Sequence, residues 1–278
     1  MTNYSVVMCV YHKDKPKYFK EAIDSILNQS KKTNDLVIVC DGPLDKELKE
    51  IIKDYKKRYS KIIKVIELDK NLGLGKAMNI GVSNCKNEII GRVDSDDIST
   101  KDRFEKELKC ILDNDLDIVG SYIEEIEKDG KRTSYIRKVP ETNEEIVKYL
   151  KYRSPFNHPT IMFKRMVLEE NKYEDLLLFE DYYLFSKLAK SNYKLGNIKE
   201  VLVYMRSDND MYRRRGGLLY IKRYLLFLNR LLKEKYINIG EYIISLIIRI
   251  PIMLLPTFIR KKIYRLFLRK KTKKKTDK

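Results

Sequence analysis

The stretch Ile89-Ile90-Gly91-Arg92-Val93-Asp94-Ser95-Asp96-Asp97 decides the fold of this chain. Its first five residues form a mostly apolar run, which is typical of a strand that is covered on both faces of a sheet. The run ends abruptly in three acids within four residues. Crowded carboxylates repel one another and are costly to desolvate, so they favour either open solvent or a divalent cation. Oxygen ligands suit Mg²⁺ or Mn²⁺, whereas the alternative for this stretch alone is a solvated loop with an Asp helix cap.

Three further apolar runs precede this stretch, at residues 5–10, 36–40 and 62–68. Between the runs, apolar residues recur at helical spacing, after Pro16, from Leu48 and from Ala77. Strands that alternate with helices predict an α/β fold with a doubly wound, mostly parallel sheet. Ligands of such sheets bind at the carboxyl ends of the strands. Tyr11, Asp41 and the acids at 94–97 all follow a predicted strand, which favours a functional site over a solvated loop.

The second half of the chain is less regular but still mixes helices and strands. Apolar spacing predicts helices at residues 101–114, 144–152 and 182–190, and strands at 117–123, 161–163 and 201–206. Lys128-Asp129-Gly130-Lys131 carries the Asp-Gly pair of a hairpin turn. We find no internal repeat in the sequence.

Length and composition indicate a globular protein with one large domain, or one domain and an appendage. The chain has 278 residues, of which 43% are hydrophobic and 35% charged. Residues 1–4 lack the basic and then apolar pattern of a signal peptide, which predicts a cytoplasmic protein. The four cysteines have no zinc-binding spacing and there are two histidines, so we expect reduced, structural thiols.

The positive charge is concentrated at the C-terminal end. Residues 213–278 hold 20 Lys and Arg against 3 Asp and Glu, whereas residues 1–212 hold 38 against 37. Nucleic-acid-binding proteins usually spread basic residues over a folded face together with aromatic side chains that stack on bases. Here the basic residues alternate with long aliphatic runs, which favours an anionic membrane surface and argues against nucleic acid.

The C-terminal region predicts helices that associate with a membrane without crossing it. A helix is expected at residues 218–233, and the apolar run 242–259 is interrupted by Arg249, Pro251 and Pro256. That run is too short and too broken for a span, which needs about 20 apolar residues. Residues 260–271 form a basic amphipathic helix suited to a membrane interface, or alternatively to docking on the protein body. Residues 270–278 are expected to be disordered and attracted to anionic lipid.

The order of these motifs resembles that of a family-2 glycosyltransferase with the GT-A fold, of the bacterial type that builds capsule, O-antigen or exopolysaccharide. The resemblance covers roughly residues 4–215. It rests on Ser5–Tyr11, Asp41-Gly42, Asn71–Gly81, Arg92–Asp97, Asn157–Thr160 and Glu180-Asp181. It implies a catalytic domain at residues 1–215, with a nucleotide-binding half at 1–97 and an acceptor half at 98–215. Residues 216–278 would then be a helical, basic C-terminal region.

The resemblance implies an inverting, metal-dependent hexosyl- or N-acetylhexosaminyl-transferase that uses a UDP-sugar and Mn²⁺ or Mg²⁺. The acceptor would be a lipid-linked saccharide at the inner face of the cell membrane, where the enzyme is peripheral. Asp94 and Asp96 match the Asp-X-Asp motif of the family. Asp96 would bind the metal directly, Asp94 would contact the ribose or the water shell of the metal, and Asp97 would be a further ligand or an orienting acid.

The resemblance also assigns a nucleotide-sugar site. Its expected residues are Tyr11, Asp41, Asn71, Gly73, Lys76, Arg92, Asp94 and Ser95. Asp41 would accept a hydrogen bond from uracil, and Tyr11 would pack near the base. The alternatives are a turn residue for Asp41, a solvated helix residue for Lys76 and a charge-balancing partner for Arg92.

An inverting transferase needs a base that takes the proton from the acceptor hydroxyl. Asp181 matches the second acid of the Glu-Asp pair of the family and is assigned as this base, with Glu180 orienting the site or binding the acceptor. Both acids would also favour the N-terminus of the following helix. His158 is assigned to the acceptor site, with a structural hydrogen bond as the alternative.

Arg213, Arg214 and Arg215 form a basic group after the last strand. We expect them to meet the diphosphate or a phosphorylated acceptor, unless they form a solvated basic turn.

Two rival functions remain open at this point. A sugar nucleotidyltransferase would also use metal-bound acids, but it needs a glycine-rich, basic pyrophosphate loop near the first strand, and residues 11–17 lack one. A non-catalytic basic protein that binds a membrane or nucleic acid would explain the C-terminal charge but not the acids at the strand ends.

Overall fold

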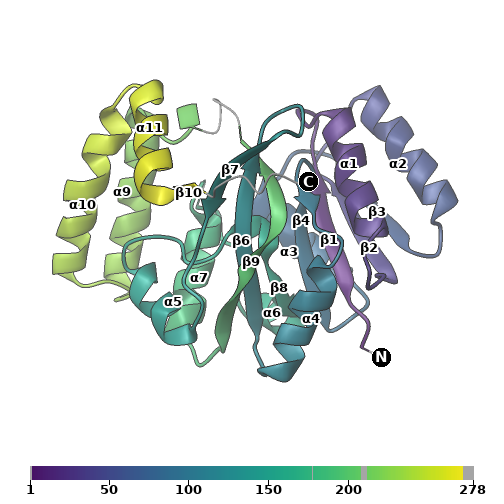
Figure 1. Ribbon diagram of the computed structural model, residues 1–278, viewed down its shortest axis with the longest axis horizontal. Helices are drawn as coiled ribbons and strands as arrows, with labels where there is room; N and C mark the ends of the chain where they lie inside the picture. Colours follow the sequence, from purple (N-terminus) through teal and green to yellow (C-terminus); the bar gives the residue numbers. More distant parts are fainter. Residues whose placement is uncertain (1, 177, 208–211, 272–278) are drawn as a thin grey trace, which may run out of the picture.

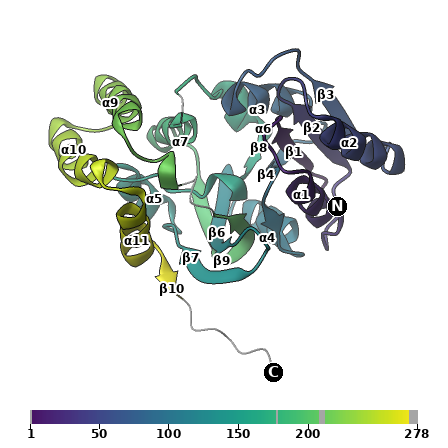
Figure 2. The same ribbon diagram turned by 90° about the horizontal axis from the view of Figure 1, so that it is seen from above.

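A computed structural model describes residues 2–176, 178–207 and 212–271. A central sheet carries helices on both faces (Figure 2), and a group of C-terminal helices packs at one end of the molecule (Figure 1).

The first half of the chain is a parallel, doubly wound unit, as the sequence predicts. The order across the sheet is β3-β2-β1-β4, and every neighbouring pair is parallel. The elements are β1 (Ser5–Val10), α1 (Pro16–Leu27), β2 (Asp35–Cys40), α2 (Lys46–Arg58), β3 (Ile63–Glu67), α3 (Leu74–Ser83) and β4 (Ile89–Asp94). Parallel pairing brings the carboxyl ends of β1, β2 and β4 to one edge of the sheet.

Side chains of the buried strands alternate between two apolar cores. Val7 of β1 packs in the core that includes Met78 of α3, whereas Val6 and Met8 pack in the core that includes Phe19 of α1. This alternation is the two-residue period of a strand, and it explains why the runs read as continuously apolar.

The second half of the sheet is mixed. β4 pairs antiparallel with β8, and β8 pairs antiparallel with β6, whose other neighbours are β7 (antiparallel) and β9 (parallel). β5 pairs with β9. The strands are β5 (Ile98–Ser99), β6 (Ile118–Ile126), β7 (Arg132–Arg137), β8 (Met162–Lys164), β9 (Leu195–Arg206) and β10 (Lys270–Lys271). The predicted hairpin turn between β6 and β7 is confirmed, and Gly130 supplies its positive φ of 87°.

The helices of this half are α4 (Arg103–Asp113), α5 (Asn143–Leu150), the 3₁₀ helix η1 (His158–Thr160), α6 (Arg165–Glu170) and α7 (Glu180–Lys190). The sequence prediction misplaces the start of the last strand and misses one helix. The last strand begins at Leu195 instead of Val201, because the exposed pair Lys199-Glu200 hides the apolar pattern that precedes it. The short helix α6 is absent from the sequence prediction.

Three helices form the C-terminal region: α9 (Leu218–Lys233), α10 (Ile239–Leu254) and α11 (Thr257–Leu268). α9 packs on α7 through Phe227, whose ring centroid lies 4.9 Å from that of Phe179 and 4.8 Å from that of Tyr182. Pro251 lies inside α10 and does not end it, so the apolar run is divided only near Pro256.

The last described residues are attached to the sheet. β10 pairs antiparallel with β7, and the Arg269 Nε lies 2.6 Å from the Glu125 Oε1, with both side chains buried. Arg260 of α11 is also buried and donates to the carbonyl of Met253. The predicted tail beyond residue 271 lies outside the described residues.

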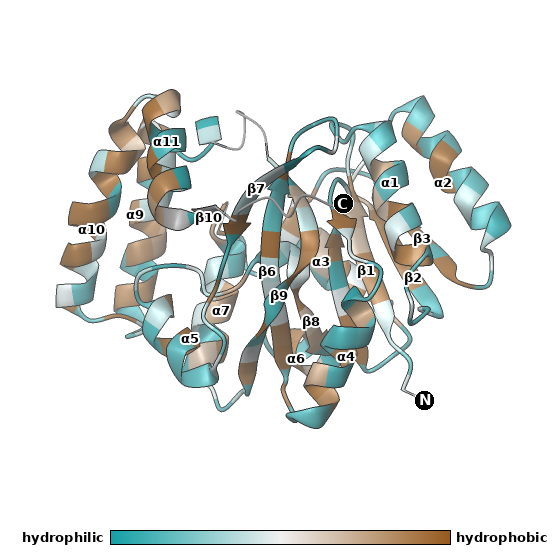
Figure 3. Cartoon of the chain, in the orientation of Figure 1, coloured by the Kyte–Doolittle hydropathy of each residue, from teal (hydrophilic) through white to brown (hydrophobic). Residues whose placement is uncertain are grey.

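The C-terminal helices are rich in apolar residues (Figure 3), and many of these side chains are exposed. The side chains that are more than half exposed there are Leu218, Leu219, Leu226, Ile239, Ile247, Ile248, Leu254, Phe258, Leu266 and Phe267. We call this set the apolar face. In the described part of the chain, no helix combines the length and the apolar character needed to cross a bilayer.

Candidate active site

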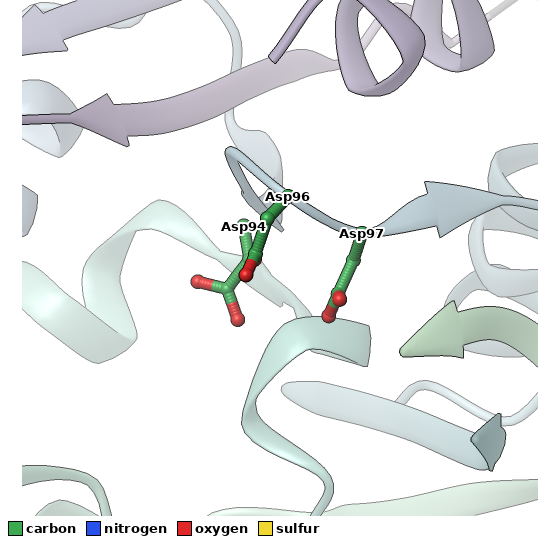
Figure 4. Close-up of side chains that lie close together, drawn as sticks. All are labelled: Asp94, Asp96 and Asp97. Carbon is green, nitrogen blue, oxygen red and sulfur yellow. The ribbon is translucent and has the colours of Figure 1, made fainter. Parts of the chain in front are cut away.

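Three carboxylates meet at the carboxyl end of β4. Asp94 is the last residue of the strand, and Asp96 and Asp97 lie in the short connection to β5. One oxygen from each lies within 4.8 Å of the others, and the side chains project to the same side of the loop (Figure 4). Asp97 does not cap a helix, because its Oδ1 accepts from the backbone N–H of Arg206 at 2.9 Å. Asp94, Asp96 and Asp97 are called the acid cluster below.

Arg92 is the principal partner of the acid cluster. Its guanidinium donates to both oxygens of Asp94, through Nη1 at 3.0 Å and through Nη2 in a shorter contact. The Arg92 side chain is buried, so this pairing holds Asp94 in one orientation. Arg92 therefore compensates the charge of Asp94 and also holds it in place within the Asp-X-Asp motif. The sequence left these two roles as alternatives.

The pKa values of two acids in the cluster, Asp96 and Asp97, are raised. Burial, with repulsion from Asp94 and Asp14, raises the pKa of Asp96 to about 7. Burial, with repulsion from Asp96, raises the pKa of Asp97 well above its ordinary value. These raised pKa values indicate that the positive groups of the chain do not fully compensate the negative charges of Asp96 and Asp97.

The residues fit a divalent cation. The donors are all carboxylate oxygens, which suit Mg²⁺ or Mn²⁺, and the buried Oδ2 of Asp97 has no hydrogen-bond partner among the described residues. Asp94, Asp96 and Asp97 would hold such an ion.

Two residues of this site carry no motif that would identify them in the sequence. Asp14 follows β1 and accepts from Ser95 Oγ at 2.7 Å and from the Tyr11 N–H at 3.1 Å. Burial raises its pKa to about 6. Arg206, at the end of β9, binds the carbonyl of Asp96 through its guanidinium. The position of Asp14 after a strand that neighbours β4 is the one signal that would have pointed to it.

The predicted nucleotide residues Asp41, Asn71 and Gly73 lie together at the end of β2. Asp41 accepts from the N–H of Leu72 at 2.7 Å and from that of Gly73 at 3.1 Å. The Asn71 side chain donates to the Asp41 carbonyl at 3.2 Å. Gly42 has φ +90°, and a Cβ there would lie 2.7 Å from the Asn71 nitrogen, so this approach requires glycine. Asp41 therefore shapes the loop at 71–73.

Tyr11 lies on the same edge, and Lys76 does not reach the acid cluster. Burial and the neighbouring Asp14 raise the pKa of Tyr11, while Arg214 lies near enough to oppose that shift. The Lys76 Nζ instead lies 2.9 Å from the Asp175 Oδ2 in an exposed ion pair.

Glu180 and Asp181 form the first turn of α7. The N–H of Tyr182 donates to the Asp181 Oδ1 at 2.7 Å, so this acid also stabilises the helix N-terminus. The buried Oε2 of Glu180 has no hydrogen-bond partner among the described residues. A Cβ on Gly75 would lie 3.8 Å from the Glu180 Cβ, which places this turn beside the start of α3.

Arg92 links the two groups of acids. Burial raises the pKa of Asp181, and the hydrogen bond from Tyr182 and the charges of Arg137, Arg92 and Arg215 oppose this rise. Since Arg92 also binds Asp94, the acid cluster and Asp181 share a neighbour.

His158 lies behind this site and makes a structural contact. Its Nε2 is 2.7 Å from the Tyr173 hydroxyl, and its ring packs against Phe185. Burial and the charge of Arg92 lower its pKa well below the ordinary value, so the ring is neutral. Among the predicted arginines, Arg215 influences Asp181, whereas Arg213 and Arg214 are exposed.

A surface hollow of about 610 Å³ lies elsewhere, against α5 and the sheet. Its lining includes Lys138, Lys148 and Lys199 together with Glu141 and Glu145. It contains none of the predicted site residues.

Comparisons with known proteins agree with this architecture. Residues 5–171 match the family described as "Glycosyl transferase family 2". The chain is 37% identical over 273 residues to an Escherichia coli protein named UDP-Gal:alpha-D-GlcNAc-diphosphoundecaprenol beta-1,3-galactosyltransferase, covering 96% of this chain and 97% of that one. It is 33% identical over 238 residues to the O-antigen biosynthesis glycosyltransferase WbnJ of Escherichia coli, covering 84% and 91%.

Solved structures support the same fold. S. aureus TarS 1-349 superposes with a TM-score of 0.59 at 21% identity, over 80% of this chain and 68% of that one. The same protein in complex with UDP superposes with a TM-score of 0.59 at 18% identity, over 95% and 87%.

A curled, mostly parallel α/β sheet with acids at its carboxyl edge is the architecture of the GT-A fold. This chain belongs to glycosyl transferase family 2, and it is a glycosyltransferase. The predicted family and fold are confirmed, and the nucleotidyltransferase and non-catalytic alternatives are set aside.

Proposed function

We propose that this enzyme transfers a hexosyl or N-acetylhexosaminyl residue from a UDP-sugar, with inversion, to a lipid-linked saccharide in bacterial surface polysaccharide biosynthesis. The acid cluster carries the proposal, because it combines three adjacent carboxylates, raised pKa values and the free Oδ2 of Asp97. The UDP and UDP-GlcNAc complexes of TarS and the UDP-Gal in the name of the E. coli relative support the donor.

The donor-side residues would act as follows. Asp94, Asp96 and Asp97 would hold Mn²⁺ or Mg²⁺, which as a Lewis acid stabilises the charge of the departing diphosphate. Arg92 keeps Asp94 oriented. Asp41, Asn71 and Gly73 would bind the nucleotide, with Tyr11 near the base and Ser95 and Lys76 at the periphery.

The acceptor side needs a base. Asp181 would take the proton of the attacking hydroxyl, and the charges of Arg137, Arg92 and Arg215 favour its ionised form. Glu180, with its free Oε2, would orient the acceptor.

We also propose separate roles for two parts of the chain. Residues 1–215 form the catalytic domain, and residues 216–278 hold the enzyme at the inner face of the cell membrane. The apolar face and the surplus of basic residues at 213–278 support an anionic membrane surface as the partner. The diphosphoundecaprenol in the name of the E. coli relative supports a membrane-embedded acceptor.

The test is a transfer assay with the purified full chain. A panel of UDP-sugars is incubated with Mn²⁺ or Mg²⁺ and an alkyl diphosphate of N-acetylglucosamine. UDP release is measured, and the anomeric configuration of the product is read by NMR. We expect one UDP-sugar to give an inverted product in the presence of the metal. Release of pyrophosphate, or a retained anomer, would contradict the proposal.

A further inference from the structure

Three arginines converge on one short segment between α5 and η1. The Arg137 Nη2 donates to the carbonyl of Ser154 at 3.0 Å, and the Arg249 Nη2 donates to the carbonyl of Tyr152 at 2.7 Å. Arg153 belongs to the segment itself and approaches the Tyr149 hydroxyl at 3.4 Å. The three come from the end of β7, from the segment after α5 and from α10. Arg137, Arg153 and Arg249 are called the arginine patch below.

No acid in the described part of the chain forms an ion pair with the arginine patch, although Arg137 lies near enough to Asp181 to oppose the rise in its pKa. Within residues 2–176, 178–207 and 212–271, none of its three guanidinium groups forms an ion pair, and the Arg137 Nε is buried without any hydrogen-bond partner. Burial and the nearby charges of Arg153 and Arg269 lower the pKa of Arg137 well below its ordinary value. Gathering like charges away from water is unfavourable unless an anion joins them.

The patch lies between the proposed base and the apolar face. Tyr182, which follows Asp181, donates through its hydroxyl to the Leu150 carbonyl at 2.6 Å, so the anchoring segment also contacts the start of α7. The Arg249 guanidinium lies 6.0 Å from the centre of the Tyr182 ring. Ile247 and Ile248, just before Arg249 on α10, are 67% and 55% exposed on the apolar face.

Arg215 adds a fourth positive charge beside the patch. Burial raises the pKa of Tyr220 to about 12, and Arg215, Arg249 and Asp181 are all close enough to influence this phenol. The base, the patch and the start of α9 therefore occupy one neighbourhood.

We propose that Arg137, Arg153 and Arg249 bind the diphosphate of the lipid-linked acceptor. This inference rests on the proposed function and assigns a subsite within it. Guanidinium groups bind phosphate oxygens through paired, charge-assisted hydrogen bonds, which a lone lysine does not reproduce. The order Asp181, arginine patch, apolar face matches the order sugar, diphosphate, lipid in such an acceptor.

The position of the patch favours the acceptor diphosphate over other phosphate groups. The donor diphosphate would lie at the acid cluster, near the start of α3, whereas the patch is built from β7, α5 and α10. Membrane headgroups would meet the exposed basic residues of the C-terminal region, but the Arg249 side chain is turned inward over Tyr182 and Tyr224.

The first experiment compares two acceptors. One is a decyl diphosphate of N-acetylglucosamine, and the other is the decyl glycoside of the same sugar without phosphate. For Arg153→Gln and Arg249→Gln, we expect the KM for the diphosphate acceptor to rise about 10- to 100-fold, since each loses charged hydrogen bonds. The KM for the UDP-sugar and that for the phosphate-free acceptor should stay unchanged. Equal changes for both acceptors, or a raised KM for the donor, would overturn the proposal.

The thermal stability of Arg153→Gln controls for folding, and two further variants control for charge and for position. Among the described residues, the Arg153 side chain makes only the long hydrogen bond to the Tyr149 hydroxyl, so Arg153→Gln should keep the thermal stability of the wild type. Arg249→Lys retains the charge without the planar fork and should show an intermediate KM. Arg58→Gln removes an exposed arginine of α2, at the other end of the sheet, and should leave all three KM values unchanged.

A binding measurement tests the site even if no transfer is detected. Decyl diphosphate is titrated calorimetrically into the full chain with Mn²⁺ and saturating UDP, which occupies the donor site. We expect the wild type to bind it and Arg153→Gln to bind at least about 10-fold more weakly. An unchanged Kd would overturn the proposal. So would a parallel loss of binding to phosphatidylglycerol vesicles, which would identify membrane headgroups as the ligand.

Discussion

The acid cluster and the arginine patch carry opposite charges, but each gathers three side chains of like charge. At the acid cluster, three carboxylates face one principal cation, Arg92, and the pKa values of Asp96 and Asp97 are raised. At the arginine patch, three guanidinium groups face carbonyl and hydroxyl oxygens, and the pKa of Arg137 is lowered.

Each region thus holds a charge that the chain itself leaves uncompensated. A structural ion-pair network would place the two signs together, as Glu107 and Arg103 do in the core with a separation of 3.0 Å. Keeping the carboxylates and the guanidinium groups apart costs stability. This separation is explained if ligands supply the opposite charges, a cation at the acid cluster and a diphosphate at the arginine patch. Asp181 lies between the two regions, where the sugar would react.

The largest effect is expected at Asp181. Asp181→Asn keeps the side-chain shape but removes the base, so kcat/KM should fall about 1000-fold in an assay of UDP release. Glu169→Gln, which changes an exposed acid of α6, should have no effect. Unchanged turnover of Asp181→Asn would show that another group is the base. Asp181 would then have no role in the reaction between the acid cluster and the arginine patch.

A smaller effect is expected at the acid cluster. Asp96→Asn removes one ligand and one negative charge, so kcat/KM should fall about 100-fold at low Mn²⁺ and recover partly at high Mn²⁺. Asp113→Asn, at an exposed position of α4, is the matched control. A loss that no metal concentration relieves would argue that Asp96 acts on the nucleotide instead.

The apolar face gives a more modest effect. Phe258 is 73% exposed, and Phe258→Ser should weaken binding to anionic vesicles about 10-fold, because the lost apolar burial is worth about 1.5–3 kcal/mol. Leu112 of α4 is 52% exposed outside this face, so Leu112→Ser should bind vesicles like the wild type. An equal loss of vesicle binding for Phe258→Ser and Leu112→Ser would contradict the proposed order of Asp181, arginine patch and lipid.

The smallest effect is on stability. The pKa of Asp96 is raised from 3.8 to about 7, so between these values the folded state binds more protons than the unfolded state. The free energy of unfolding therefore falls as pH rises through this window. In EDTA, Asp96→Asn should remove this contribution and raise Tm relative to the wild type by several degrees at pH 8, but not at pH 4.

Metal provides the complementary measurement. Because Mn²⁺ competes with protons for the same carboxylates, its effect on the Tm of the wild type should grow from pH 5 to pH 8. A Tm difference between wild type and Asp96→Asn that does not change with pH would contradict the assigned pKa shift.

The parallel half of the fold and the acid cluster could be predicted because their signals are local. Each buried strand is one apolar run, and the acids follow β4 directly, so the topology brings Asp41 and Asp94 to one edge. Glu180 and Asp181 were found by their resemblance to a family motif. The burial of the Glu180 Oε2 and the proximity of Asp181 to Arg92 were not foreseen.

The rest depends on contacts between distant segments. Asp14 and Arg206 join the acid cluster from the ends of β1 and β9, and in the sequence each is one of many charged residues. Arg137, Arg153 and Arg249 lie on three elements, and only the packing of α10 against residues 149–154 brings them together. The sequence left the C-terminal helices either on a membrane or docked on the body, and the structure shows docking together with an exposed apolar face.

The buried pair of Glu125 and Arg269 constrains how the C-terminal region can be shortened. Glu125 is fully buried; Arg269 pairs with it, and the hydroxyls of Tyr212 and Ser207 donate to it at 3.2 and 3.3 Å. A truncation that ends before Arg269 would leave an unpaired carboxylate inside the protein, at a cost of about 3–5 kcal/mol. Such a protein would lose activity by unfolding, and the loss would be mistaken for a need for lipid. A truncation meant to release the enzyme into solution should therefore retain residue 271.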